Sequence, residues 1–87
     1  MANAEWERLK EALRKPATPE AMAEAAQRFR EYERVKRLSG KPGSTPTLVS
    51  LGFRKDYPTQ IAVRDIPGEL ERNPAFFEQM RKIVGED

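Results

Sequence analysis

Residues 18–40 constrain the fold of this chain more than any other segment, because they carry signals for both ends of one long helix. Thr18 supplies a hydroxyl that can cap free amide groups, and Pro19 follows at the first helical position, where its missing N–H costs nothing. Ser39 and Gly40 then indicate the helix end. We therefore expect one long helix here, with the rest of the chain packed around it.

The order of the remaining elements follows from similar patterns. Pro16 ends a first helix with a narrow apolar stripe, and the short connection that follows predicts an antiparallel helical hairpin over residues 3–38. We expect a β-hairpin over residues 47–66 and a C-terminal helix over residues 74–84. The expected fold is α+β, with the order α-α-β-β-α, in a single small domain that covers residues 1–87.

The expected β-hairpin depends on a change of hydrophobic period from helical to two. Val49, Leu51 and Phe53 alternate with other residues, and Ile61 and Val63 return on the same side before a Pro-Gly pair stops the second strand. A sheet of two strands needs a helix over its apolar face, and the C-terminal helix is the expected cover. The open strand edges invite pairing with a second copy of the chain, so we expect a homo-oligomer.

Composition excludes several classes of function. The 87 residues include neither Cys nor His, which excludes disulfide scaffolds, the common zinc sites and nucleophiles of the Ser/His or Cys/His type. No carboxylate spacing typical of a cation site is present either. We therefore expect no enzyme activity, no cofactor and no bound metal, and no motif indicates a small-molecule substrate.

The chain also lacks the sequence features of a membrane or secreted protein. No run approaches the roughly 20 apolar residues that span a bilayer, and the first 15 residues are too polar for a signal peptide. We expect no membrane contact and an intracellular, cytoplasmic location.

A basic ridge is the first candidate binding surface. Arg30, Arg34 and Arg37, which define this ridge, fall on one side of the long helix, and Lys41 follows in the next loop. Such a ridge could lie along a phosphate backbone or enter a groove of a duplex. The alternative is that interleaved glutamates neutralise these side chains through pairs four residues apart, and the small formal net charge of +2 favours that alternative.

The tip of the expected hairpin is the second candidate. Arg54 and Lys55 stand there with Tyr57 nearby, so the tip could add phosphate contacts to those of the basic ridge. The alternative is that the tip is charged because it is exposed to water.

Aromatic residues give a third candidate, a protein interface. Trp6, Tyr57, Phe76 and Phe77 are many rings for a small core, and aromatic residues are enriched at interface cores. The adjacent Phe76 and Phe77 cannot both point in one direction from a helix. One of them could therefore anchor a partner, and the alternative is that both fill the core.

These observations favour a small non-catalytic binding or regulatory module that acts through protein contacts, with itself or with another protein. Its size and mixed charge suit an accessory, inhibitor or assembly factor of a phage or mobile element. The alternative function is nucleic-acid binding through the basic ridge and the hairpin tip.

Overall fold

The computed structural model describes residues 4–37, 46–47 and 61–85 of the chain. Helices account for 82% of these residues, and no β-strand occurs among them. The described part of the chain is all-α, so the expected α+β fold is wrong.

The first two helices form an antiparallel pair. Helix α1 spans Ala4–Leu13, with Glu5 and Glu7 in its first turn. Acidic side chains there interact favourably with the positive end of the helix dipole. Helix α2 spans Pro19–Lys36, and the Thr18 hydroxyl accepts a hydrogen bond of 3.1 Å from the Ala21 amide. Capping by Thr18 and proline at the first helical position thus fix where α2 begins, as the sequence predicts.

Replacing Thr18 with alanine removes this cap. We expect Thr18→Ala to lower the free energy of unfolding by about 1 kcal/mol, because the Ala21 amide loses its acceptor. Urea denaturation followed by circular dichroism measures the change. Ala17→Ser, at the partly buried neighbouring position, adds a hydroxyl one residue too early and does not restore the cap in the Thr18→Ala background. Full stability of Thr18→Ala would contradict this account.

Helix α2 ends earlier than the Ser-Gly signal predicts. The last helical residue is Lys36, and Arg37 takes a left-handed conformation with φ of 55°. In that conformation its amide donates to the carbonyl oxygens of Glu33 and Arg34, which satisfies carbonyl groups that the helix end leaves free. A non-glycine residue therefore terminates α2.

The β-hairpin expected over residues 47–66 is absent from the described residues. Thr47 and Ala62 form one isolated antiparallel bridge, and the Val63 amide donates to the Pro46 carbonyl oxygen at 2.8 Å. From Val63 the chain is helical: the short 3-10 helix η1 spans Val63–Asp65 and α3 spans Ile66–Arg72. The intervening part of the expected hairpin, residues 48–60, lies outside the described residues.

The correction has a simple physical reason. Val63, Ile66, Pro67 and Leu70 are buried, and this spacing places them on one side of a helix. Pro67 lies in the first turn of α3, where the missing amide hydrogen leaves no bond unmade. The Pro-Gly pair expected to stop a strand therefore lies inside the start of a helix.

Helix α4 spans Pro74–Gly85 and repeats the way in which α2 begins. Asn73 precedes the proline, and its side-chain oxygen accepts a hydrogen bond of 3.1 Å from the Ala75 amide. The Asn73 carbonyl oxygen also accepts from the amides of Phe76 and Phe77. Asn73 thus separates α3 from α4 and lets the chain change direction between them.

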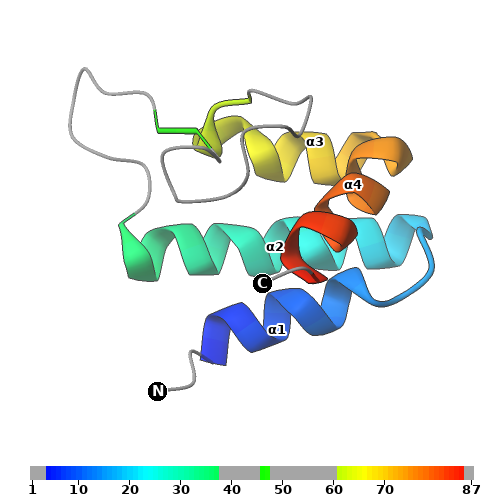
Figure 1. Cartoon of the computed structure of the whole chain (residues 1–87), viewed down its shortest axis with the longest axis horizontal. Coiled ribbons are helices and arrows are strands. Elements are labelled where there is room, and N and C mark those ends of the chain that lie inside the picture. Colours follow the sequence, from blue (N-terminus) through cyan, green and yellow to red (C-terminus); the bar gives the residue numbers. More distant parts are fainter. Residues whose placement is uncertain (1–3, 38–45, 48–60, 86–87) are drawn as a thin grey trace.

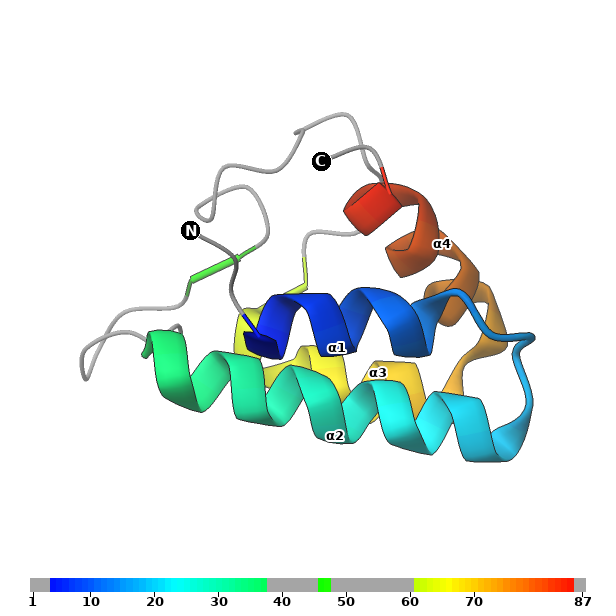
Figure 2. The same cartoon turned by 90° about the horizontal axis from the view of Figure 1, so that it is seen from below.

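Helix α2 lies between α1 and α3, and α4 closes the bundle by contacting both of these outer helices (Figures 1 and 2). The core is one cluster of buried side chains from all four helices and η1. Its largest fully buried members are Phe29, Phe77, Leu9, Leu13, Ile66, Leu70, Met80, Ile83 and Val63.

Phe76 and Phe77, the expected interface anchors on α4, both lie in this core. Their exposed fractions are 4% and 0%. Because α4 packs against α1 on one side and α3 on another, two adjacent rings can both be buried although they point in different directions. Both rings are therefore part of the core in this fold.

Arg81 ties α4 to the end of α1. Its guanidinium donates to the carbonyl oxygens of Leu13 and Lys15, pairs with Glu78 at 2.7 Å and lies 5.2 Å from the centre of the Phe77 ring. The carbonyl groups at a helix end have no partner within the helix. Arg81 therefore caps α1 from a segment far along the chain.

Candidate functional site

The basic ridge is only partly neutralised. Arg30 forms an ion pair of 3.2 Å with Glu71 on α3, whereas Arg34 and Arg37 are exposed and form no ion pair with any residue in the described part of the chain. The left-handed backbone at Arg37 ends the helical spacing on which pairing four residues apart depends. The C-terminal end of α2 therefore carries two guanidinium groups, those of Arg34 and Arg37, whose charge no described carboxylate neutralises.

A third uncompensated arginine lies across from this ridge. Arg64, on η1, is exposed and likewise forms no ion pair with a described residue. Figure 1 shows η1 above the C-terminal half of α2. The structure thus adds Arg64 to the positive charge of Arg34 and Arg37 at one end of the bundle.

The other predicted site residues are distributed differently. Trp6 is half-buried and packs against Tyr32, with ring centres 5.0 Å apart. Lys41, Arg54, Lys55 and Tyr57 lie outside the described residues.

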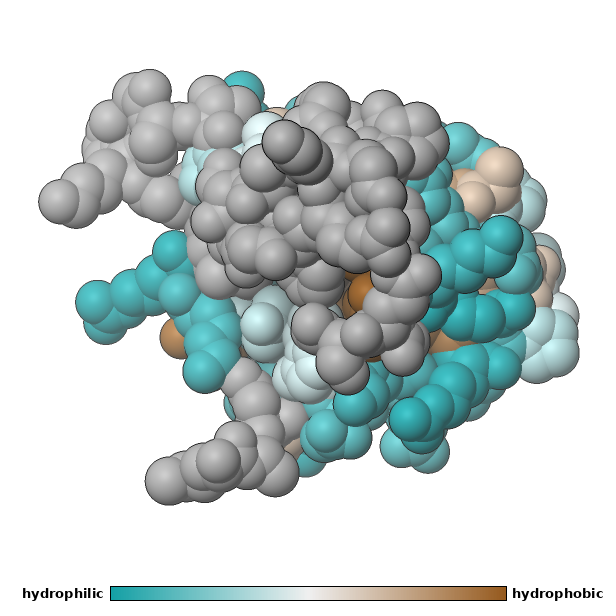
Figure 3. Space-filling view, viewed as in Figure 1, coloured by the Kyte–Doolittle hydropathy of each residue, from teal (hydrophilic) through white to brown (hydrophobic). Residues whose placement is uncertain are grey.

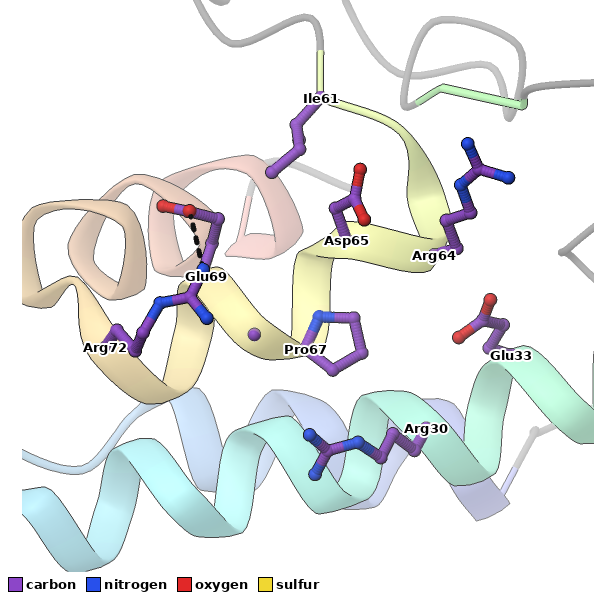
Figure 4. A pocket seen from close by; sticks show the side chains of 9 residues that line it. Arg30, Glu33, Ile61, Arg64, Asp65, Pro67, Glu69 and Arg72 are labelled. Atoms are coloured by element: carbon purple, nitrogen blue, oxygen red, sulfur yellow. Dashed lines mark hydrogen bonds and ion pairs between the residues drawn. The ribbon is translucent and has the colours of Figure 1, made fainter.

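An open hollow of about 540 Å³ lies at the surface beside the contact of α2 with η1 and α3 (Figure 4). We call it the α2–α3 hollow. Its lining combines three guanidinium groups, three carboxylates and a smaller apolar part: Arg30, Glu33, Ile61, Arg64, Asp65, Pro67, Gly68, Glu69 and Arg72. This volume is in the range of about 300–1,000 Å³ typical of ligand pockets.

Ion pairs position two of the arginines around this hollow. Glu71 holds Arg30 at 3.2 Å, and Glu69 holds Arg72 at 3.2 Å. In Figure 4, Arg30 extends from α2 and Arg72 from α3, and Asp65 lies where η1 leads into α3. The hollow therefore presents hydrogen-bond donors and acceptors together.

Gly68 keeps the side of α3 that lines the hollow free of a side chain. A Cβ atom at Gly68 would lie 3.4 Å from the nearer terminal nitrogen of Arg72. Glycine inside a helix costs up to about 1 kcal/mol relative to alanine. A methyl group would fit there at van der Waals distance, whereas a longer side chain would meet the Arg72 guanidinium.

The described surface carries little apolar area. Val35, with 52% of its surface exposed, is the one exposed large hydrophobic residue in the described part of the chain. In the view of Figure 3 the coloured surface is mostly hydrophilic, and the brown areas are small. Binding through the described surface must therefore be mainly polar.

A second hollow, between α1 and α2, has a volume of only about 110 Å³ and is lined by paired charges. There Lys15 contacts Glu24 at 2.5 Å and Arg28 lies 3.8 Å from the same carboxylate. The hydrogen bond from Lys15 holds the pKa of Glu24 below its usual range, against the opposing effect of partial burial. Lys15 and Arg28 thus share one carboxylate, and the small volume of this hollow leaves little room for a ligand.

The described residues include no group of three acidic side chains placed to hold a metal ion. None of their helices combines the length and apolar character needed to cross a bilayer.

Sequence reasoning missed the residues of η1 and α3 that complete the hollow, namely Arg64, Asp65, Gly68, Glu69 and Arg72. One available signal was the Asp65-Ile66-Pro67 order, which resembles the polar-residue-then-proline starts of α2 and α4. If α3 had been predicted as a helix, Gly68 near its start would have indicated that another part of the chain approaches the helix there.

The arrangement can bind anions at Arg34, Arg37 and Arg64 and can hydrogen-bond a polar group in the α2–α3 hollow. Comparisons of the chain with protein-family models, with curated proteins and with solved structures gave no match.

Proposed function

We propose that this chain is a non-catalytic binding module that contacts nucleic acid through Arg34, Arg37 and Arg64. The observation that supports the proposal is the pattern of charge pairing. Lys10, Lys15, Arg28, Arg72 and Arg81 each have a carboxylate partner. Of the arginines that have none among the described residues, these three lie together near the C-terminal end of α2 and on η1.

Guanidinium groups suit phosphate for geometric reasons. Their planar array of N–H donors can bind two phosphate oxygens at once, and the group stays charged at any physiological pH. Each phosphate neutralised on a single strand releases counterions and contributes about −0.7 to the slope of log affinity against log salt. Three contacts therefore predict a slope of about −2.

The experiment measures binding of labelled single-stranded and duplex oligonucleotides by fluorescence anisotropy over a range of salt concentrations. We expect the triple variant Arg34→Gln, Arg37→Gln, Arg64→Gln to bind about tenfold more weakly or worse at low salt and to lose most of the salt dependence. Glutamine keeps the length and polarity of the side chains while it removes the charge.

A matched control removes the same charge elsewhere. Arg8, Arg14 and Lys82 are also exposed and form no ion pair with a described residue, but they lie on α1 and α4. Their triple glutamine variant is expected to keep the affinity within a fewfold of the parent protein. Equal losses in both triple variants, or no binding by the parent protein at low salt, would overturn the proposal.

A protein partner is the second candidate, because Val35 is exposed next to Arg34 on α2. An apolar side chain beside a positive charge suits an acidic protein surface, as an accessory, inhibitor or assembly factor would meet, or a second copy of the chain. Polyglutamate serves as the competing anionic probe. Binding to polyglutamate as tight as to nucleic acid, or a dimer by light scattering that Val35→Ser dissociates, would favour this candidate.

A further inference from the structure

The α2–α3 hollow includes Arg64, one of the uncompensated arginines, yet the charge of its whole lining does not suit a phosphate backbone. The lining has three negative charges, from Glu33, Asp65 and Glu69. It has three positive charges, from Arg30, Arg64 and Arg72. A phosphate that entered it would meet these carboxylates and be repelled. The group that fits this lining is polar but neutral, with both donors and acceptors on its edge.

An unpaired nucleobase has this chemistry. Carboxylates accept hydrogen bonds from the exocyclic amino group of cytosine, and guanidinium groups donate to ring nitrogens and carbonyl oxygens of bases. A flat base can also stack on the plane of a guanidinium group or rest on an apolar wall, here formed by Ile61 and Pro67. Arg30 and Arg72, which pair with Glu71 and Glu69 at 3.2 Å, provide such planes at the edge of the hollow.

Gly68 gives the hollow the open side that a flat ligand needs. A Cβ atom at this position would lie within 3.4–3.7 Å of the Arg72 guanidinium, so a larger side chain would displace that group or fill the space beside it. Alanine would make the better helix at this position. Position 68 is thus a place where a long side chain would fill the hollow, whereas a methyl group would make only ordinary contacts.

We propose that the protein binds single-stranded nucleic acid and that the α2–α3 hollow receives one unstacked base with an amino group, while Arg34, Arg37 and Arg64 contact the neighbouring phosphates. This inference rests on the proposed function. A duplex keeps its bases stacked and paired, so it can make only the phosphate contacts.

The test compares oligodeoxycytidine with oligothymidine of equal length, because both bases are pyrimidines and only cytosine carries the amino donor. We expect the parent protein to bind the cytosine strand about tenfold more tightly than the thymine strand or a duplex. Gly68→Leu fills the hollow without changing any charge. It is expected to lose this preference and to retain the salt slope set by the three arginines.

Ala23→Leu is the matched control, because Ala23 is exposed on α2 and does not line the hollow. This variant should keep the preference for cytosine. Thermal melting of both leucine variants establishes that they are folded.

Asp65→Asn provides a second test should Gly68→Leu fail to fold. Removing this negative charge weakens the acceptor for the amino group, so the ratio of cytosine to thymine affinity should fall toward one. If the hollow only repels phosphate, Asp65→Asn instead tightens binding of both strands equally and leaves the ratio unchanged.

The two proposals fail in different ways. Salt-dependent binding with equal affinity for cytosine and thymine strands, unaffected by Gly68→Leu, would overturn the base-binding inference and leave phosphate binding by the arginines intact. Absence of any binding at low salt by the parent protein would overturn both.

Discussion

Phe77→Ala is expected to lower the free energy of unfolding by about 3–5 kcal/mol, the usual range for removing a buried phenylalanine ring. Phe77 is fully buried, and its ring also lies against the Arg81 guanidinium at 5.2 Å. Proteins have about 0.05–0.15 kcal/mol of stability per residue, so this loss is a large part of the total for a chain of this size. Urea denaturation followed by circular dichroism measures it.

The control for Phe77→Ala is Val35→Ala, at the exposed position on α2. We expect this change to alter the stability by no more than about 0.5 kcal/mol, as at most surface positions. A Phe77→Ala protein that melts like the parent but loses self-association would instead restore Phe77 as a partner anchor, which contradicts its place in the core.

Arg81→Met is expected to lower the free energy of unfolding by about 2–3 kcal/mol. Methionine retains most of the aliphatic length that packs near Phe77 but removes the donors to the Leu13 and Lys15 carbonyl oxygens. Hydrogen bonds from a charged donor contribute about 1.5–3 kcal/mol, and partial exposure of Arg81 reduces the sum of two such bonds. Hydrogen exchange should also show faster opening of the last turn of α1.

Two further variants test whether the lost stability comes from the two hydrogen bonds of Arg81 or from its charge. Lys82→Met changes the exposed neighbour on α4 and should leave the stability within about 0.5 kcal/mol of the parent protein. Arg81→Lys keeps the charge but lacks the planar fork that reaches two acceptors, so it should recover only part of the loss. Equal stabilities of the lysine and arginine proteins would mean that charge alone accounts for the effect.

The parts of the fold that the sequence predicts are those with local signals. Thr18-Pro19 and Asn73-Pro74 mark the starts of α2 and α4 because a capping side chain and a proline act within one helical turn. Helix α3 was missed because it has only seven residues, too few for its period to outweigh the alternation of Ile61 and Val63 just before it. The end of α2 was misplaced because the left-handed conformation falls on Arg37, where glycine is the usual residue.

The candidate site was predictable only in part for a related reason. The helical spacing of Arg30, Arg34 and Arg37 follows directly from the sequence, but their state of pairing does not. Arg30 pairs with Glu71, which is 41 residues away, and that partner comes into reach only because α3 packs on α2. The same packing creates the α2–α3 hollow. Because α3 was predicted as part of a strand and its end, the residues that it contributes to the hollow could not be predicted.

The contact of Arg81 with α1 also bears on how the protein is made. Its hydrogen bond to Leu13 joins residues 68 positions apart, and α4 is the last of the described helices to leave the ribosome. Until then, the carbonyl groups at the end of α1 lack the Arg81 guanidinium as a donor. The side of Leu13 near Val84 is also still exposed to water. Until α4 has been made, the nascent chain therefore exposes apolar surface to chaperones or to other chains, and the bundle is completed in a step that joins α4 to α1.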